Sequence, residues 1–180
     1  VLALIDALGA ERAVLIGHDW GCALAWQVAR CHPERVAAVV GLSVPYGGPA
    51  PKPPTDAMRD LFRDHFFYML YFQRPELPEQ ELEADVEDSL RRMFHSLSAD
   101  CIDDFSVAPD STGVLQSMQR PSAPPRWMRD EDLAYYVARF TKTGFTGALN
   151  WYRAMDASWE ESRDDENWMI PAPTLFLGGM

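Results

Sequence analysis

The sequence predicts an α/β fold in which a mostly parallel sheet is interrupted by a helical insertion. Three short apolar segments, residues 12–16, 36–44 and 171–178, are typical of strands buried in parallel sheets. A proline-rich connector and several amphipathic helical patterns stand between the second and third segments. The expected parts are residues 1–48 as a sheet-containing core, residues 49–165 as a helical insertion, and residues 166–180 as a return to the core.

The first part of the chain reads as helix, strand, helix, strand. A helical stripe over Val1–Leu8 is closed by a glycine, and Arg12–Ile16 is short, apolar and partly β-branched. After Gly21, apolar residues recur at helical spacing until Pro33 bars continuation. Val36–Val44 reads as the next buried strand. A strand, a tight glycine-containing turn, a helix and a strand make a βαβ unit.

The insertion follows the proline-rich connector Gly47–Pro54, which cannot continue a central strand. We expect one helical face ending at Leu97, a second helix from about Asp130 to Gly144, and a third helix through Trp151 and Tyr152. Residues 121–125 are expected to form a loop. The apolar faces comprise Leu82, Val86, Leu90, Met93, Phe94 and Leu97 in the first case, and Leu133, Tyr136, Val137 and Phe140 in the second.

Composition excludes several classes of function. The 180 residues carry a formal net charge of −11, which disfavours nucleic acid as a partner because phosphate binding draws on clustered Lys and Arg. No apolar run approaches the roughly 20 residues of a membrane-spanning helix, and the opening residues do not resemble a signal peptide. The odd number of cysteines, with Cys22 and Cys31 nine positions apart on one helix, predicts reduced thiols and a cytoplasmic location. No histidine and cysteine spacing indicates a metal site.

The segment Gly17-His18-Asp19-Trp20-Gly21 carries the strongest chemical signal. Small residues two before and two after a central nucleophile are typical of the strained strand-to-helix elbow that lifts a side chain clear of a sheet. Asp19 stands at the nucleophile position, where both flanking glycines are expected to avoid collisions and the helix N-terminus favours a negative charge. The alternative interpretation is that Asp19 only caps the helix. The strand before it and the helix after it favour a nucleophilic carboxylate.

With that elbow, the sequence resembles the α/β-hydrolase fold and, within it, soluble-type epoxide hydrolases. The segments Tyr68-Met69-Leu70-Tyr71-Phe72-Gln73-Arg74-Pro75 and Gly144-Phe145-Thr146-Gly147-Ala148-Leu149-Asn150-Trp151-Tyr152-Arg153 are similar to the two cap motifs of that family, in family order. Cys22 departs from the usual glycine or alanine, but a small thiol should fit. The resemblance implies a partial α/β-hydrolase fold with a helical cap or lid, the N- and C-terminal parts of the core being absent from this chain.

The resemblance also implies roles for individual residues. Asp19 would attack an apolar epoxide and form an ester, while Tyr68 and Tyr152 donate to the epoxide oxygen, because a phenol with a pKa of about 10 keeps its proton at neutral pH. Trp20 would give a backbone N–H to the oxyanion hole. No cofactor or metal is implied. The expected substrate pocket comprises His18, Trp20, Tyr71 and Trp151.

The same resemblance places three catalytic parts outside these residues. The general-base histidine and its acid partner are expected beyond Met180, and a second oxyanion donor before Val1, so the 180 residues alone are not expected to turn over. One alternative is a haloalkane dehalogenase, whose halide product needs no proton from phenols. Another is a binding module that kept the elbow and lid without catalysis. An esterase is disfavoured because the elbow has Asp19 in place of serine.

Overall fold

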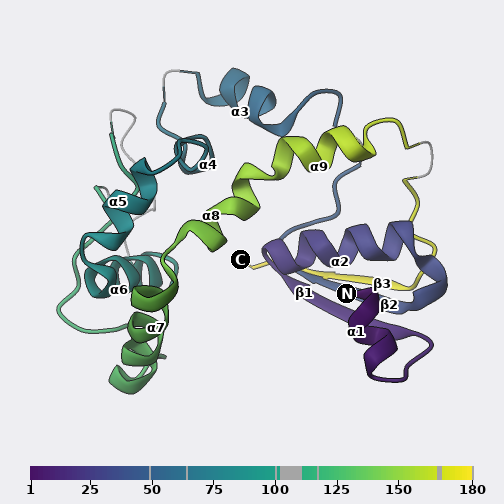
Figure 1. The fold of residues 1–180 in the computed structure, drawn as a ribbon, viewed down its shortest axis with the longest axis horizontal. Helices are drawn as coiled ribbons and strands as arrows, with labels where there is room; N and C mark the ends of the chain where they lie inside the picture. The colour runs from purple at the N-terminus through teal and green to yellow at the C-terminus, as the bar shows by residue number, and fades with distance from the viewer. Residues whose placement is uncertain are drawn as a thin grey trace. The chain divides into compact units, whose positions relative to one another are not determined.

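The chain folds as two compact units (Figure 1). The sheet unit comprises Val1–Pro51 with Glu161–Met180, and the helical unit comprises Lys52–Glu160. The boundaries predicted at residues 49 and 166 fall on residues outside the described part of the chain. The computed structural model describes residues 1–48, 50–63, 65–99, 101, 111–116, 118–165 and 168–179.

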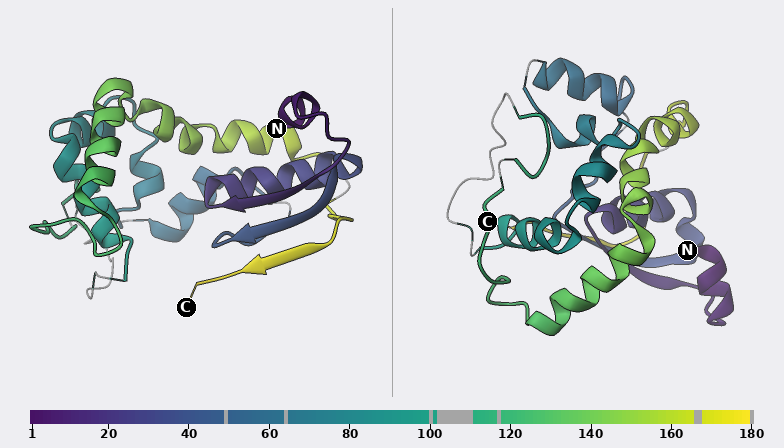
Figure 2. Two further views of the ribbon diagram at one scale, coloured as in Figure 1. Left: turned by 90° about the horizontal axis from the view of Figure 1, so that it is seen from below. Right: turned by 60° about the vertical axis from the view of Figure 1, so that its left-hand side comes forward.

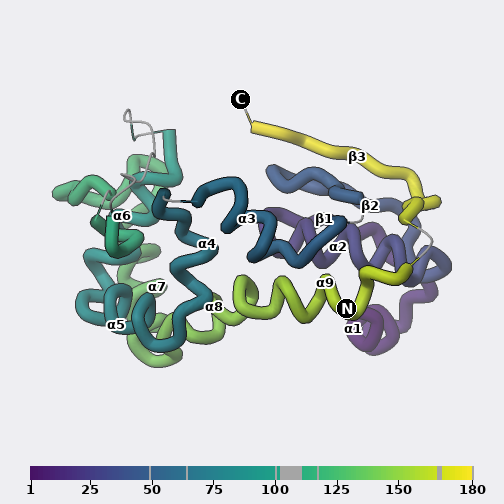
Figure 3. Tube along the Cα trace, turned by 90° about the horizontal axis from the view of Figure 1, so that it is seen from above, coloured from purple at the N-terminus to yellow at the C-terminus, as the bar shows by residue number. Residues whose placement is uncertain are grey.

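Among the described residues, the sheet unit has three parallel strands in the order β1-β2-β3. Helix α2 connects β1 to β2, as the βαβ prediction required, and β3 arrives from the far end of the chain to lie beside β2 (Figures 2 and 3). The Ser43 N–H donates to the Leu177 carbonyl at 3.0 Å beyond the last paired residues. The elements are α1 (Leu2–Ala7), β1 (Ala13–His18), α2 (Trp20–Cys31), the 3-10 turn η1 (Pro33–Arg35), β2 (Val36–Leu42) and β3 (Thr174–Leu177).

Helix α2 packs on one face of the sheet because its small and apolar residues recur at helical spacing. Cys22 and Trp26 are buried against Val39, and both donate a hydrogen bond to the Val44 carbonyl, at 2.9 and 3.0 Å. A Cβ added at Gly41 would lie 2.7 Å from the Cys22 Sγ and 2.8 Å from the Trp26 Cε2. Glycine at this position therefore allows helix and strand to approach closely, and the Cys22 thiol fits as expected.

The opposite face of the sheet is exposed among the described residues. Val14 and Ile16 of β1 are 57% and 69% exposed, and every residue of β3 is exposed. Within these 180 residues, the prediction of fully buried strands is therefore wrong for β1 and β3. For β1 the reason is that, among the described residues, α2 covers only one face, so strand alternation sends every second side chain to the uncovered side. β3 lies at the edge of the described sheet, with only β2 beside it.

The helical unit holds the second apolar core. Its centre lies between α5, α6, α7 and α8, with Leu82, Leu90, Leu133 and Leu149 each buried. Gly144, at a φ of 67°, follows α7, which begins at Asp130 as the sequence predicts. The helices are α3 (Pro54–Phe62), α4 (Tyr68–Tyr71), α5 (Leu77–Glu83), α6 (Val86–Ser96), α7 (Asp130–Thr143), α8 (Thr146–Arg153) and α9 (Met155–Ser162).

Two residues of the predicted apolar faces depart from the core. Leu97 is 72% exposed and directly follows α6, which ends at Ser96. Its N–H still donates to the Met93 carbonyl at 3.0 Å, so the helical phase reaches Leu97, and the side chain is exposed because little of the described chain covers this end of the face. Tyr136 is 41% exposed and lies at the rim, with its ring 5.1 Å from that of Phe94. The other residues of both predicted faces belong to the core cluster or pack against it.

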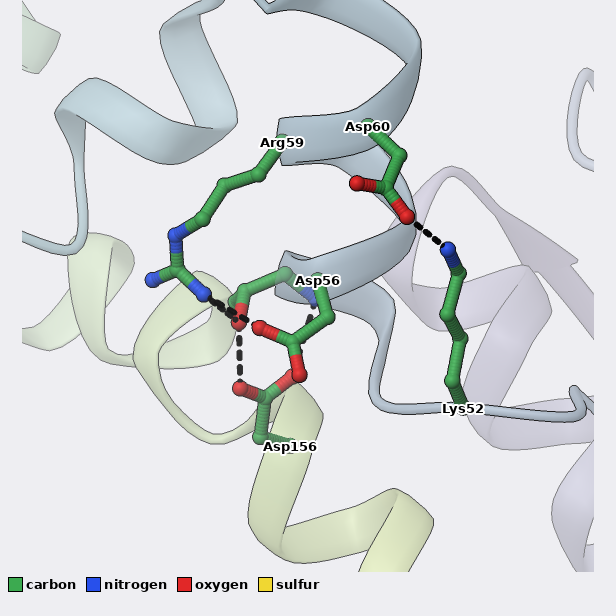
Figure 4. A network of polar contacts seen from close by, with 6 residues as sticks. Lys52, Asp56, Arg59, Asp60 and Asp156 are labelled. Atoms are coloured by element: carbon green, nitrogen blue, oxygen red, sulfur yellow. Dashed lines mark hydrogen bonds and ion pairs between the residues drawn. The ribbon is translucent and has the colours of Figure 1, made fainter.

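The start of α3 is fastened to α9 within the helical unit. The carboxylate of Asp156 accepts the backbone N–H of Thr55 at 3.0 Å and its hydroxyl at 2.5 Å (Figure 4). Arg59 donates to the Thr55 hydroxyl at 3.0 Å and pairs with Asp56 at 2.7 Å. Because Thr55 is 3% exposed, Asp156 satisfies donors of a helix N-terminus that water cannot reach.

Other sequence predictions concern membranes and thiols. In the part of the chain that the structure describes, no helix combines the length and apolar character needed to cross a membrane. Cys22 and Cys31, which both lie on α2, are free thiols, as predicted.

Candidate active site

Asp19 lies at the sharp turn between β1 and α2. Its φ of 53° and ψ of −123° place it in a region that residues with a side chain rarely adopt. The Asp19 carbonyl accepts the N–H groups of Cys22 and Ala23, at 2.9 and 3.2 Å, and so begins the hydrogen bonding of α2. A strained, non-glycine residue between a parallel strand and a helix is the geometry of a nucleophile elbow.

The two glycines of the elbow have different reasons to be small. A Cβ added at Gly17 would lie 2.5 Å from the carbonyl carbon of Gly21 and 2.6 Å from the amide nitrogen of Cys22. Around Gly21, no atom of the described residues lies within 4 Å of an added Cβ, apart from its chain neighbours and the adjacent backbone of α2. The expected collision is thus confirmed for Gly17, which meets the backbone of Gly21. Among the described residues, no such collision is found at Gly21.

The Asp19 side chain is exposed and makes no capping hydrogen bond at the start of α2. A capping aspartate would accept an N–H from the first turn of its own helix. The carboxylate instead stands beside the helix N-terminus, where the first-turn amide groups carry a partial positive charge. A carboxylate that is not engaged in capping its own helix can act chemically as a nucleophile.

The neighbours of Asp19 lie on different elements. His18 is the last residue of β1, pairs with Leu42 of β2 and is exposed on the uncovered side of the sheet. Trp20 is the first residue of α2 and is half-buried. Its backbone N–H therefore stands in the first turn of the helix, where amide groups carry a partial positive charge.

Tyr68 and Tyr152 are neighbours within the helical unit although 84 positions separate them in the sequence. Their ring centroids lie 5.9 Å apart with the planes at 80°. Phe72 completes the cluster, with its ring 5.6 Å from that of Tyr68 and 5.0 Å from that of Tyr152. Tyr68 begins α4 and Tyr152 is the penultimate residue of α8. The two cap motifs therefore bring two phenols together.

Polar side chains join the segments that carry these tyrosines. The Gln73 Nε2 donates to the Tyr152 carbonyl at 3.0 Å, and the Arg153 Nε donates to the Phe72 carbonyl at 2.9 Å. Sequence reasoning quoted Gln73 and Arg153 only as letters of the motifs and assigned them no role. The signal that could have found them is a long polar side chain directly after an aromatic residue in each cap motif, Gln73 after Phe72 and Arg153 after Tyr152.

Tyr71 lies one turn from Tyr68 and has a different environment. It is 5% exposed, and its hydroxyl donates to the Glu81 carboxylate at 2.8 Å. Burial, together with the hydrogen bond to Glu81, raises the pKa of Tyr71 above its usual value. The same carboxylate accepts the N–H groups of Val114 and Leu115 at 3.0 and 2.9 Å. Tyr71 thus ties α4 to α5 and to the segment that begins at residue 111.

Trp151 lies on α8 beside Tyr152 and is 47% exposed. The predicted site residues are therefore divided between the units. The sheet unit holds His18, Asp19 and Trp20, and the helical unit holds Tyr68, Tyr71, Trp151 and Tyr152. Among the residues that the structure describes, no group of three or more His, Cys, Asp or Glu side chains is arranged to hold a metal ion.

Comparisons with known proteins identify relatives of this chain. The chain is 42% identical to epoxide hydrolase A of Mycobacterium tuberculosis over 99% of its own length and 56% of that protein. It is 34% identical to the bifunctional epoxide hydrolase 2 of Rattus norvegicus over 98% of its length and 32% of that protein. The crystal structure of epoxide hydrolase A from Mycobacterium thermoresistibile superposes with a TM-score of 0.88 at 44% identity, covering 99% of this chain and 56% of that one.

The chain spans about half the length of epoxide hydrolase A in both comparisons. The sequence model of the family described as alpha/beta hydrolase fold matches residues 1–180. That match agrees with the parallel sheet and the βαβ unit. The chain therefore belongs to the alpha/beta hydrolase fold family.

Proposed function

We propose that the protein containing this chain is an epoxide hydrolase in which Asp19 is the nucleophile and Tyr68 and Tyr152 are the proton donors. The observation that carries the proposal is the combination of a carboxylate at a strained elbow with two adjacent phenols. The named activities of the relatives support the same reaction. In this proposal the helical unit is the cap, and its tyrosines meet the substrate that Asp19 attacks.

The first chemical step is a displacement at a saturated carbon. An Asp19 carboxylate oxygen forms a bond to one epoxide carbon, and the bond between that carbon and the epoxide oxygen breaks. The departing oxygen gains negative charge and takes a proton from a tyrosine hydroxyl, while the second tyrosine donates a hydrogen bond. The product is an ester of Asp19 carrying a neighbouring hydroxyl group. A carboxylate suits this step because it attacks without first losing a proton.

The second step is hydrolysis of that ester. Water loses a proton to the general base as it attacks the ester carbonyl carbon, and the vicinal diol leaves. The carboxylate of Asp19 is restored, and the one proton released overall by the hydrolysis returns to the tyrosinate left by the first step. The Trp20 N–H would stabilise the oxyanion, because it stands in the first turn of α2 beside Asp19. A general-base histidine, its acid partner and a second N–H donor would come from parts of the full-length protein outside this chain.

The remaining predicted residues would shape the pocket. Trp151 and Trp20 would contribute apolar walls, which favours an apolar epoxide as the substrate, and His18 would orient or pack beside the elbow. Tyr71 would form part of the wall and support the cap, because its hydroxyl is already engaged by Glu81. Proton donation is thereby assigned to Tyr68 and Tyr152.

The experiment uses the full-length protein with an apolar terminal epoxide and, separately, a chloroalkane. We expect diol formation without halide release, loss of ester formation in Asp19→Ala, and strongly reduced epoxide opening in Tyr68→Phe and Tyr152→Phe. Tyr135→Phe is the matched control, because Tyr135 is 58% exposed on α7. The Arg139 guanidinium lies over its ring, 4.9 Å from the centroid, and Tyr135 is not part of the cluster of Tyr68 and Tyr152.

Two results would replace the proposal with an alternative. Halide release from the chloroalkane, unaffected by the two Tyr→Phe variants, would indicate a dehalogenase. Binding of the epoxide by the full-length protein without any turnover or ester would indicate a non-catalytic binding module.

A further inference from the structure

Helix α8, which carries Tyr152, is held near both ends by glutamates of α5. At its start, the Glu83 Oε1 accepts the N–H of Phe145, the residue before the helix, at 2.8 Å. At its end, Arg153 pairs with Glu79 through two contacts of 2.6 and 2.9 Å. Such a forked pair fixes the direction of both side chains as well as their distance.

The Arg153 guanidinium makes further bonds to the segment that follows α4. Its Nε donates to the Phe72 carbonyl at 2.9 Å, and one terminal nitrogen donates to the Arg74 carbonyl at 3.1 Å. One side chain therefore links α5, α8 and the chain directly after the helix that begins at Tyr68. A lysine could not reproduce this pattern, because its ammonium group has no planar fork that reaches several acceptors at once.

The pair between Arg153 and Glu79 is shielded from water. The side chains of the two residues are only 19% and 13% exposed, whereas the α6 pair between Arg91 and Glu87 has a glutamate that is 55% exposed. Hydrogen bonding by Arg153 lowers the pKa of Glu79. Glu79 is therefore ionised at neutral pH and holds the guanidinium in place.

We propose that Arg153, held by Glu79, is a positioning residue that fixes the spacing of the Tyr68 and Tyr152 hydroxyls for donation to a single substrate oxygen. The inference rests on the proposed function, because it assumes that both phenols act on the epoxide. Two donors must converge on one small atom, so a displacement of α8 relative to α4 moves one hydroxyl out of reach. A misplacement of about 1 Å costs on the order of 100-fold in rate.

The test measures single-turnover rates of the full-length protein for ester formation and, separately, for ester hydrolysis. Glu79→Gln removes the charge that holds Arg153 with little change of shape, and Arg153→Lys keeps the charge but loses the fork. We expect ester formation to slow by roughly 10- to 100-fold in both variants, with hydrolysis of the ester unchanged. The double variant should be no slower than the slower single variant, because the two residues act as one unit.

The control is Glu87→Gln, the same chemical change in an exposed ion pair of α6, which should leave both rates unchanged. Wild-type ester formation in folded Glu79→Gln and Arg153→Lys would overturn the inference. Equal slowing of both steps, or a loss of folded protein with a normal rate per folded site, would also overturn it. If Glu79→Gln does not fold, the rates of ester formation and ester hydrolysis in Arg153→Lys test the inference in the same way.

Failure of the proposed function has a different signature. If Tyr68→Phe and Tyr152→Phe form the ester at the wild-type rate, the phenols are not donors and the proposed function fails whatever the Arg153 variants do. If the tyrosine variants are slow but the Glu79 and Arg153 variants are normal, only the positioning role fails.

Discussion

Replacing Gly17 by alanine should destabilise the elbow far more than the same change at Gly21. The new Cβ at Gly17 would lie 2.5 and 2.6 Å from the Gly21 carbonyl carbon and the Cys22 nitrogen, both backbone atoms that no rotamer change can move. Relief therefore requires a shift of α2 or β1, which costs on the order of 3 kcal/mol. At Gly21 the added methyl group meets no atom of the described residues outside its own stretch of α2, and within a helix alanine is favoured over glycine by about 1 kcal/mol.

The assay is urea unfolding of the full-length protein carrying Gly17→Ala or Gly21→Ala. With a slope of about 2 kcal/mol per molar urea, the Gly17 variant should unfold at a midpoint lower by about 1.5 M, and the Gly21 variant at an unchanged or slightly higher midpoint. Equal midpoints for the two variants would refute the packing argument at the elbow. A stable Gly17→Ala variant with wild-type ester formation would refute the link between the tight turn and the position of Asp19.

Three further predictions concern the helical unit. Asp156→Ala should lower the free energy of unfolding, measured with urea, by about 2 kcal/mol, because the buried N–H and hydroxyl of Thr55 lose their acceptor. The control Asp60→Ala breaks only the exposed ion pair with Lys52 and should lower the free energy of unfolding by less than 1 kcal/mol. Because the pKa of Glu79 is lower in the folded state, its ionised side chain stabilises the fold above the unfolded pKa near 4.3. This stability is lost as the pH falls through the folded pKa. In an acid titration followed by circular dichroism, wild type should therefore lose more stability than Glu79→Gln. Because the pKa of Tyr71 is higher in the folded state, its protonated hydroxyl stabilises the fold below about pH 10, and this stability is lost as the pH rises toward the folded pKa. In an alkaline titration followed by circular dichroism, Tyr71→Phe should therefore lose less stability than wild type.

Local signals in the sequence predicted the elements around the elbow well. Pro33 and Gly144 mark helix ends in the structure because one cannot continue a helix and the other adopts a φ of 67°. The parallel pairing of the first two strands follows from the helix between them. These features depend on a few neighbouring residues, which is why a single sequence contains them.

Burial was predicted less well because it depends on what covers each surface. The apolar strand around Ile16 looks the same in sequence whether one face or both faces are covered. Leu97 keeps the helical hydrogen bond of α6 and is nevertheless exposed, which the apolar spacing alone does not reveal. Packing by distant segments decides such cases.

In the candidate site, too, residues marked by local sequence signals could be predicted, whereas contacts between distant segments could not. Glycine spacing pointed to Asp19, and motif resemblance pointed to Tyr68 and Tyr152. The partners of Arg153 could not be predicted, because its bonds to Glu79 and Phe72 span 74 and 81 positions and leave no periodic signal. Likewise, the sequence gives no sign that Glu81 engages the Tyr71 hydroxyl, ten positions away across two helices.

The central claim is that Asp19 forms a covalent ester with the epoxide. The most direct measurement is a single turnover of the full-length protein, in excess over the epoxide, in water enriched in ¹⁸O. Because water attacks the ester at the carbonyl carbon, the account predicts that the first diol contains no ¹⁸O and that the peptide containing Asp19 gains it. Incorporation of ¹⁸O into the diol during that first turnover, with an unlabelled Asp19 peptide, would show direct attack by water and contradict the account.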